Sequence, residues 1–343
     1  MPDGLDARRN AAMPCRRPPA VLLVGIAYFT TAAFSDRQVM TLFIEQCLNG
    51  VQFGLLLFLL AAGLTLVFGI MDLVNLAHGS LYMLGAYFAA TFAAWTGSFV
   101  FAAVLALAAT LVVGMTVEVI VMRRLYGRDH LDHVLGTFGL LLFFDEAVRL
   151  IWGPAGITLP LPPWLNTPVQ ILPGIQYSAY RLTLIGLTLA TAAFLNVLVM
   201  HTRVGMLIRA GASNREMVGA LGVNIKVLFT LVFGLGAALA GLAGLMQAPI
   251  FTAQIGMGEN ILIIAFVITV IGGIGSVRGA FMAAIIVGFV DTLGRAFFPD
   301  LLRLMLSKDA ASTAAPALSS MLIYLLMAVV LVVRPDGLFP VRK

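Results

Sequence analysis

Charged residues are scarce in this chain of 343 residues: Asp, Glu, Lys and Arg make up 11%, whereas soluble domains carry about 25%. Lysine occurs only at Lys226, Lys308 and Lys343, and none of these fits the GxxxxGK[ST] loop that holds nucleotide phosphates. The GxSxG and HExxH patterns of hydrolases and metalloproteases are also missing. These absences exclude a cytosolic enzyme and leave the chain without a visible site for splitting ATP.

Cysteine is equally rare, with Cys15 and Cys47 alone and no CxxC pattern, so a redox function has no support. His130, Asp132 and His133 lie close together in the sequence, but no further ligand stands near them. A zinc site needs three or four ligands. We therefore expect no metal and no cofactor bound by this chain.

Hydrophobic residues, in contrast, make up 61% of the chain and gather in runs long enough to cross a bilayer as helices. They predict an all-α polytopic membrane protein of about ten transmembrane helices (8–10), interrupted by Gly-rich helix breaks. The runs lie near 21–38, 48–70, 73–95, 99–122, 133–152, 181–200, 227–250, 260–276, 279–298 and 317–333.

The basic residues fall between these runs and alternate in number, which predicts the orientation in the membrane. One set of connections holds fifteen Lys and Arg residues and the alternate set holds six. The richer set includes both chain ends, so we expect N- and C-termini in the cytoplasm. Because the net charge of +5 comes from these short clusters, it does not indicate a nucleic-acid surface.

The N-terminus is ambiguous. A basic tail over 1–20 precedes a short apolar run over 21–38, which fits a further span or an uncleaved signal anchor. Residues 1–40 could equally be a start-site artefact. The main membrane domain is expected over 39–340, with its longest cytoplasmic loop over 201–226.

Two segments break the helical pattern within apolar surroundings: 69–79, rich in polar residues, and 271–279, rich in glycine. In hydrocarbon, irregular backbone persists only where protein or a watery cavity surrounds it. Asn75 and His78, three residues apart, would share one helical face there. They either satisfy the freed backbone groups or line a path, and the sequence weighs these alternatives about evenly.

Acidic residues in or near the spans are functional suspects, because charge is costly in a bilayer. Each of the following has an arginine within about one turn, which favours a plain ion pair. The expected pairs are Glu118 with Arg123 or Arg124, Asp145 and Glu146 with Arg149, and Asp291 with Arg295.

The loop 201–226 predicts a short helix capped by Ser213 or Asn214, with Glu216 in its first turn and a stop at Leu221-Gly222. Such a helix, held between spans on the cytoplasmic face, is either a solvated loop helix or a docking element for a soluble partner.

Three motifs in order resemble the permease subunits of branched-chain amino acid type ABC importers. VNLAHG at 74–79 is similar to the family's VNFAHG, 201–246 resembles its cytoplasmic loop and following helix, and IGGIGSVRGA at 271–280 resembles its third signature. RPDGLF at 334–339 resembles the usual family ending. The resemblance covers roughly residues 48–339.

The resemblance implies an ATP-driven importer in the bacterial inner membrane, in which this chain is a multi-pass transport subunit and not an enzyme. Its expected partners are a second homologous permease (giving a hetero- or homodimer), two cytoplasmic ATPases that bind ATP and Mg, and an extracytoplasmic solute-binding protein. The solutes would be branched-chain or other hydrophobic amino acids, or related small amides and acids. The implied ATPase-coupling residues are Arg209, Arg215, Glu216, Ala220, Leu221, Gly222 and Asn224. We expect the translocation path to be lined by Asn75, His78, Gly79, Gly272, Gly273 and Gly275.

Two other classes remain as alternatives. An ion-coupled secondary transporter or channel would need an intramembrane acidic pair, for which Asp145 and Glu146 are the candidates. A membrane-embedded enzyme would need an acid that converges on Asn75 and His78, and the sequence places none there.

Overall fold

The structure is a computed structural model that describes residues 36–172, 175–304 and 306–339. The predicted basic tail and most of the predicted first span lie outside these residues. The chain divides into two compact units, 1–44 and 45–343. The described part of the first unit is the start of helix α2, and everything below concerns the second unit.

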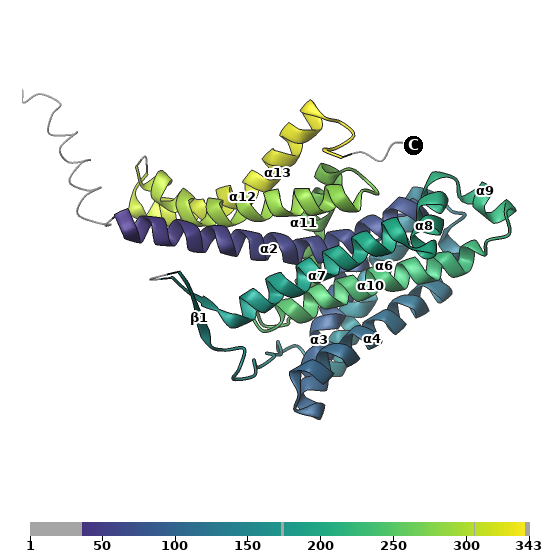
Figure 1. Ribbon diagram of the computed structural model, residues 1–343, viewed down its shortest axis with the longest axis horizontal. Helices are drawn as coiled ribbons and strands as arrows, with labels where there is room; N and C mark the ends of the chain where they lie inside the picture. The colour runs from purple at the N-terminus through teal and green to yellow at the C-terminus, as the bar shows by residue number, and fades with distance from the viewer. Residues whose placement is uncertain (1–35, 173–174, 305, 340–343) are drawn as a thin grey trace, which may run out of the picture. The chain divides into compact units, whose positions relative to one another are not determined.

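The described chain is almost entirely helical, as the composition predicts, and the elements can be followed in Figure 1. The helices in chain order are α2 (Asp36–Met71), α3 (His78–Thr96), α4 (Phe99–Val117), a π-helix (Glu118–Met122), α5 (Arg123–Leu125), α6 (His130–Trp152), α7 (Ala179–His201), α8 (Arg203–Ser213), α9 (Arg215–Ala220), α10 (Ile225–Gln247), α11 (Met257–Gly272), α12 (Val277–Arg303) and α13 (Lys308–Val333).

Among the described residues, six helices are long and apolar enough to cross a membrane. They are found at Met40–Met71, Phe99–Leu125, Ala179–His201, Ile225–Gln247, Val277–Arg303 and Lys308–Val333. A polytopic all-α membrane protein is thus confirmed, whereas the count of ten spans is not. The difference arises partly at α11, which has only 16 residues and is too short for a full crossing.

Close helix packing organises the second unit. α3, α4 and α10 pack against one another, α11 and α13 pack on α12, and α11 also touches α3. α2 contacts both groups through glycines, at α10 and at α12. A Cβ atom on Gly63 would lie 2.7 Å from the Gly236 carbonyl oxygen and 3.0 Å from the His78 ring. Only glycine therefore permits this approach, as is common between membrane helices.

Both predicted helix breaks are present. α2 ends at Met71, and Asp72 adopts a left-handed φ of 52°, the conformation that commonly ends a helix. The chain resumes as α3 at His78. At the second break, Gly273 and Gly275 take φ values of 99° and 81° between α11 and α12. These positive angles explain why this turn is rich in glycine.

The segment between α6 and α7 contains a β-hairpin of β1 (Pro168–Leu172) and β2 (Ile175–Ser178), which the sequence did not predict. Leu159 and Leu165 are buried beneath this segment, and Ile157 forms a backbone bridge with Ala253.

Candidate functional site

The loop between α7 and α10 forms two short helices, each with a side-chain cap. Thr202 accepts a hydrogen bond from the Gly205 backbone N–H at the start of α8, at 3.0 Å. Asn214 accepts from the Met217 N–H at 2.9 Å and so begins α9, with Glu216 in the first turn. The predicted cap, short helix and acidic first turn are confirmed, whereas α8 was not predicted as a separate helix.

One face of α9 is buried against the protein and the other is exposed. Val218 is buried against the bundle, while Met217 and Leu221 are exposed, Leu221 to 77%. Gly222 follows with a φ of 89°, which ends the helix as predicted. Arg215, Glu216 and Ala220 are also exposed. Exposed apolar side chains on a helix that is packed against the protein are typical of a protein docking surface.

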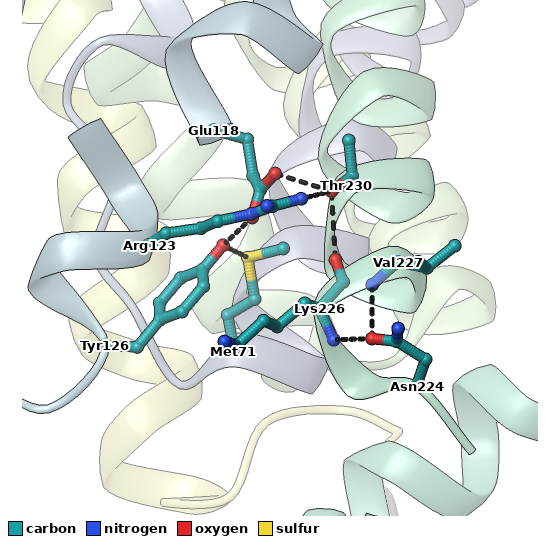
Figure 2. Close-up of polar contacts among 8 residues, drawn as sticks. All are labelled: Met71, Glu118, Arg123, Tyr126, Asn224, Lys226, Val227 and Thr230. Atoms are coloured by element: carbon teal, nitrogen blue, oxygen red, sulfur yellow. Dashed lines mark hydrogen bonds and ion pairs between the residues drawn. The ribbon is translucent and has the colours of Figure 1, made fainter. Parts of the chain in front are cut away.

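Asn224 joins this loop to the membrane bundle. Its side-chain oxygen accepts hydrogen bonds from the Lys226 and Val227 N–H groups, at 3.1 and 3.3 Å, and thereby caps α10 (Figure 2). One turn further along α10, Thr230 reaches a buried carboxylate on the neighbouring π-helix. The loop that carries α9 thus leads directly into the capped first turn of α10.

The buried carboxylate belongs to Glu118, which is 0% exposed. Figure 2 shows its partners converging from two elements: Arg123 Nε donates at 3.2 Å, the Tyr126 hydroxyl at 2.7 Å and the Thr230 hydroxyl at 2.6 Å. Arg123 also donates to Thr230 at 2.8 Å. The predicted pairing of Glu118 with Arg123 is confirmed, and Arg124 takes no part in it.

The sequence did not predict the tyrosine and threonine of this cluster. Thr230 lies more than a hundred residues from Glu118, and Tyr126 lies eight residues away, beyond the spacing of ordinary helical pairs. Burial, followed by the hydrogen bond to Glu118, raises the pKa of the Tyr126 hydroxyl above its ordinary value. It therefore stays protonated and remains a donor throughout the physiological pH range. Its oxygen also lies 3.9 Å from the sulfur of Met71, the last residue of α2. The cluster thus links the start of α10 to the first helix break.

A large cavity of about 900 Å³ opens beside this loop, and we call it the inner cavity. Its walls come from the second half of α2, the second half of α7, the side of α8 and the start of α12. Most of the lining is apolar, and Arg209 and Arg278 stand at its rim. Neither an aspartate nor a glutamate lies among the lining residues in the described part of the chain.

The chain's ending completes this cavity. Phe339 contributes to its lining, and the backbone N–H groups of Leu338 and Phe339 donate to the carbonyls of Ile271 and Gly272 at 2.8 and 3.1 Å. The RPDGLF ending is therefore fastened to the glycine turn between α11 and α12. A sequence pattern could not have revealed this pairing, since the two segments are more than sixty residues apart.

A second cavity of about 340 Å³, here called the outer pocket, lies at the other end of the same helices. α7 lines the outer pocket at Arg181 and the inner cavity at Val199. These residues are about 27 Å apart along the helix at 1.5 Å per residue, close to the thickness of a bilayer core. α2 and α12 likewise run from one cavity to the other. The three helices therefore connect two openings on opposite sides.

The connection between the cavities is closed by tight packing. Phe58 of α2 and Phe281 of α12 meet edge to face, with ring centroids 5.1 Å apart, at the end of the inner cavity. Beyond them, a Cβ atom on Gly54 would lie 2.7 Å from the carbonyl oxygen of Ala284. The side chains and backbone of α2 and α12 therefore fill the space between the two cavities.

The six residues predicted to line a path lie in three different environments. Asn75, His78 and Gly79 are fully buried behind α2 and do not line either cavity. Gly275 lines the inner cavity. Gly272 packs on Gly279 within the turn, and Gly273 packs against the chain's ending. Their role in a path stays a prediction.

Asn75 has an unusual environment. Its amide nitrogen and oxygen are both buried and find no hydrogen-bond partner among the described residues. His78, in contrast, has its Nε2 atom 3.2 Å from the Leu60 carbonyl oxygen, whereas its Nδ1 atom has no partner there. The one hydrogen bond of these two side chains is therefore made to α2, and neither side chain bonds the freed backbone groups of the break among the described residues.

Two of the other predicted ion pairs are present, whereas the predicted pair of Asp145 with Arg149 is not found among the described residues, and Asp145 makes a side-chain hydrogen bond with Glu259 instead. Arg149 binds Glu146 at 3.0 Å, and Arg295 binds both carboxylate oxygens of Asp291 at 2.9 Å. The ring of His133 contacts the Leu125 carbonyl oxygen at 2.8 Å. Within the described ranges, no group of three His, Cys, Asp or Glu side chains is placed to hold a metal ion.

Comparison with known proteins identifies the family. Residues 46–331 match the family described as the permease component of the branched-chain amino acid transport system. The high-affinity branched-chain amino acid transport permease protein BraD of Pseudomonas aeruginosa is 30% identical over 272 residues, covering 75% of this chain and 88% of BraD. LivH of Escherichia coli K12, which carries the same description, is 29% identical over 275 residues, covering 74% and 87%. The probable LivH of Methanocaldococcus jannaschii is 25% identical over 250 residues, covering 69% and 76%.

No solved structure matches the chain. The family match nevertheless spans the membrane helices, both breaks, the loop and both cavities. The chain belongs to the family of permease components of branched-chain amino acid ABC transport systems, and it is a transport subunit, not an enzyme.

Proposed function

We propose that this chain forms half of the membrane path of an importer that is driven by two separate cytoplasmic ATPases. A second homologous permease, identical or different, forms the other half, and an extracytoplasmic solute-binding protein delivers the solute. The solutes are branched-chain or other hydrophobic amino acids, with related small amides and acids as the wider class. Two relatives of the chain, BraD and LivH, are described as high-affinity branched-chain amino acid transport permeases, which supports this substrate class.

The observation that carries the proposal is the link between α9 and the bundle. Met217 of α9 and Leu221 just after it are exposed on an anchored surface, and Asn224, three residues further on, caps α10. Thr230 then connects α10 to the carboxylate of Glu118. An ATPase docked on α9 would therefore move α10 rather than a loose loop. Arg209 and Arg215 flank this surface with positive charge.

The proposed path runs between the outer pocket and the inner cavity, along α2, α7 and α12. ATP-driven movement would separate these helices at the Phe58–Phe281 contact, a two-state transition between openings on opposite sides. The glycine turn Gly272–Gly275 lies at the start of α12 and would serve as its hinge. The mostly apolar inner cavity suits aliphatic side chains.

The first break is proposed as a second moving part. A buried amide without partners costs about 1–3 kcal/mol, so the unpartnered state of Asn75 favours a different environment in another conformation or beside the second permease. On this basis Asn75, His78 and Gly79 remain proposed path residues, which are exposed when the path opens.

The proposed orientation places the loop 201–226 and both termini in the cytoplasm of a bacterial cell, with ten spans in the inner membrane. The distribution of fifteen against six basic residues supports it. The 27 Å separation of the cavities adds support, because the inner cavity lies beside the loop that carries α9.

Gly222→Asp tests the coupling role. Gly222 has a φ of 89° and no atom within 4 Å of an added Cβ, so the substitution distorts the end of α9 without a clash in the bundle. We expect ATP-dependent leucine uptake to fall to background while the amount of folded protein in the membrane is retained. Gly127→Asp is the matched control, since Gly127 is exposed, lies in another loop and also has open space.

Normal uptake by Gly222→Asp, with the control equally normal, would contradict the coupling role. The ion-coupled alternative predicts a different result: uptake driven by an ion gradient in vesicles that contain this chain and no ATPase. Glu146, one of the two acids it would need, is already paired with Arg149.

A further inference from the structure

The outer pocket is lined by several polar side chains. Its walls come from the start of the second unit's α2, the start of α7, the end of α12 and the segment that follows α10. Arg181 and Arg295 both line it, and its described lining residues include no acid. An uncompensated positive pocket at the end of a membrane bundle favours an anionic group.

Arg181 is the cation without a countercharge. Its Nη1 donates to the side-chain oxygen of Asn49, and its guanidinium lies 5.9 Å from the centre of the Tyr177 ring. The described residues place no carboxylate within ion-pair distance of it. A guanidinium has five N–H donors. Most of the donors on Arg181 are therefore left for another acceptor.

Arg295 differs, since both oxygens of Asp291 already accept from its Nε. The charge of Arg295 is therefore neutralised on its own helix. Arg181, held in one orientation by Asn49 and Tyr177, is left as the group that can bind a carboxylate. Planar two-point binding of carboxylates is the geometry that guanidinium groups provide.

Two amide side chains in the same pocket also lack partners. Gln52 and Gln247 are only 7% and 8% exposed and both line the pocket. Neither side-chain amide makes a hydrogen bond with a residue in the described part of the chain, although the Gln247 backbone carbonyl accepts from the Ile250 and Phe251 N–H groups. Both residues are largely buried but line the pocket, so their amide groups are available to a polar ligand there. Their oxygens can accept from an ammonium group, and their NH₂ groups can donate to a carboxylate.

Gln46 and Thr292 also line the pocket, and its apolar lining residues are Phe53, Ile250, Phe251 and Ala296. At about 340 Å³ the pocket falls within the range of small-molecule sites. A cation, two free amides and an apolar wall match the three parts of a hydrophobic amino acid: carboxylate, ammonium and aliphatic side chain.

We propose that the outer pocket is a binding site for a free amino acid with an apolar side chain, in which Arg181 binds the α-carboxylate and Gln52 and Gln247 bind the polar head. The site receives the solute at the outer opening, before the contact between α2 and α12 separates. This inference rests on the proposed function and adds to it the group that selects α-carboxylates.

The test is ligand binding to the full chain in lipid nanodiscs, without ATP and without a solute-binding protein. L-Leucine and L-leucinamide are the probes, because the amide keeps the ammonium and side chain but lacks the carboxylate. Saturation-transfer NMR measures both dissociation constants, including weak ones. The variants are Arg181→Gln and Arg181→Lys. Arg303→Gln is the control, since Arg303 is an exposed arginine that pairs with Asp300 outside the pocket.

We expect Arg181→Gln to weaken leucine binding at least 10-fold, the loss typical for a hydrogen-bonded charge pair, and to leave the affinity for leucinamide unchanged. Arg181→Lys keeps the charge and should lose less, and Arg303→Gln should lose nothing. Gln247→Leu provides a second variant of similar size and should weaken both probes, because it removes a contact with the polar head. If Arg181→Gln does not fold, this variant and the two probes still decide the question.

Equal leucine affinity in Arg181→Gln and the parent chain would overturn the proposal. So would an equal loss for leucine and leucinamide, which would show that Arg181 only shapes the protein. Unchanged binding of both probes in Gln247→Leu would also overturn it, because the polar head of the ligand would then have no partner at this position. None of these results depends on ATP-driven uptake, so a failure here and a failure of the proposed function are distinguishable.

Discussion

Replacing Glu118 by Ala is the sharpest test of how the loop is held to the bundle. The substitution removes a buried carboxylate that accepts hydrogen bonds from Arg123, Tyr126 and Thr230. Breaking a buried pair by deleting one partner costs about 3–5 kcal/mol. Because the Arg123 side chain is 32% exposed and water can rehydrate it, we expect a somewhat smaller loss of about 2–4 kcal/mol.

Glu146→Ala is the control, since it also removes a glutamate from an ion pair with an arginine. Here both side chains are about half exposed, at 60% and 53%, so we expect a loss of at most about 1 kcal/mol. The assay is thermal or denaturant unfolding of the purified proteins in the same detergent, read as the free energy of unfolding. A second readout is the ATPase activity of the assembled importer, which should continue in Glu118→Ala while uptake falls. Equal stability of the two variants, with uptake intact, would refute the role of Glu118.

Three further predictions follow from particular residues. Asn224→Ala removes the cap of α10, so it should lower the free energy of unfolding by about 1 kcal/mol and speed amide hydrogen exchange in the first turn of α10. Asn224→Asp should retain the protection, and equal exchange in the two variants would contradict the cap. Asp72→Val should lower the free energy of unfolding by about 1–2 kcal/mol, because a β-branched residue is strained at φ 52°, while Asp72→Gly should change it by less than about 0.5; the reverse order in a melting assay would argue against the left-handed turn. Gly63→Val should abolish accumulation of folded protein, since its Cβ would meet the Gly236 carbonyl and the His78 ring, and Gly186→Val, with nothing within 4 Å, should accumulate normally; similar levels on a membrane immunoblot would disprove the close packing.

Local patterns in the sequence predicted what depends on near neighbours. The Asn214 cap, the stop at Gly222 and the two helix breaks follow from residues within a few positions of one another, and all are present. The pairing of Glu118 with Arg123 was accessible for the same reason. The family motifs could be recognised because they too are contiguous.

Contacts between distant segments could not be predicted in this way. Thr230 joins Glu118 across 112 residues, and Leu338 and Phe339 pair with Ile271 and Gly272, which lie more than sixty residues earlier in the chain. The outer pocket combines Arg181 with amides from α2 and α10, and each of these residues alone is an ordinary polar residue at a helix end. The predicted ten spans are not confirmed, partly because hydrophobicity marks α11 although its 16 residues are too few for a full crossing.

Reconstitution tests the central claim most directly. The chain is placed in proteoliposomes with its partner permease, the two ATPases and the solute-binding protein, and radiolabelled leucine uptake is measured against a concentration gradient. The account predicts that leucine accumulates only with ATP on the side of the membrane that holds the ATPases and with the solute-binding protein on the opposite side. This accumulation should be lost with Gly222→Asp. Uphill uptake by the chain alone under an ion gradient, with no ATPase present, would contradict it.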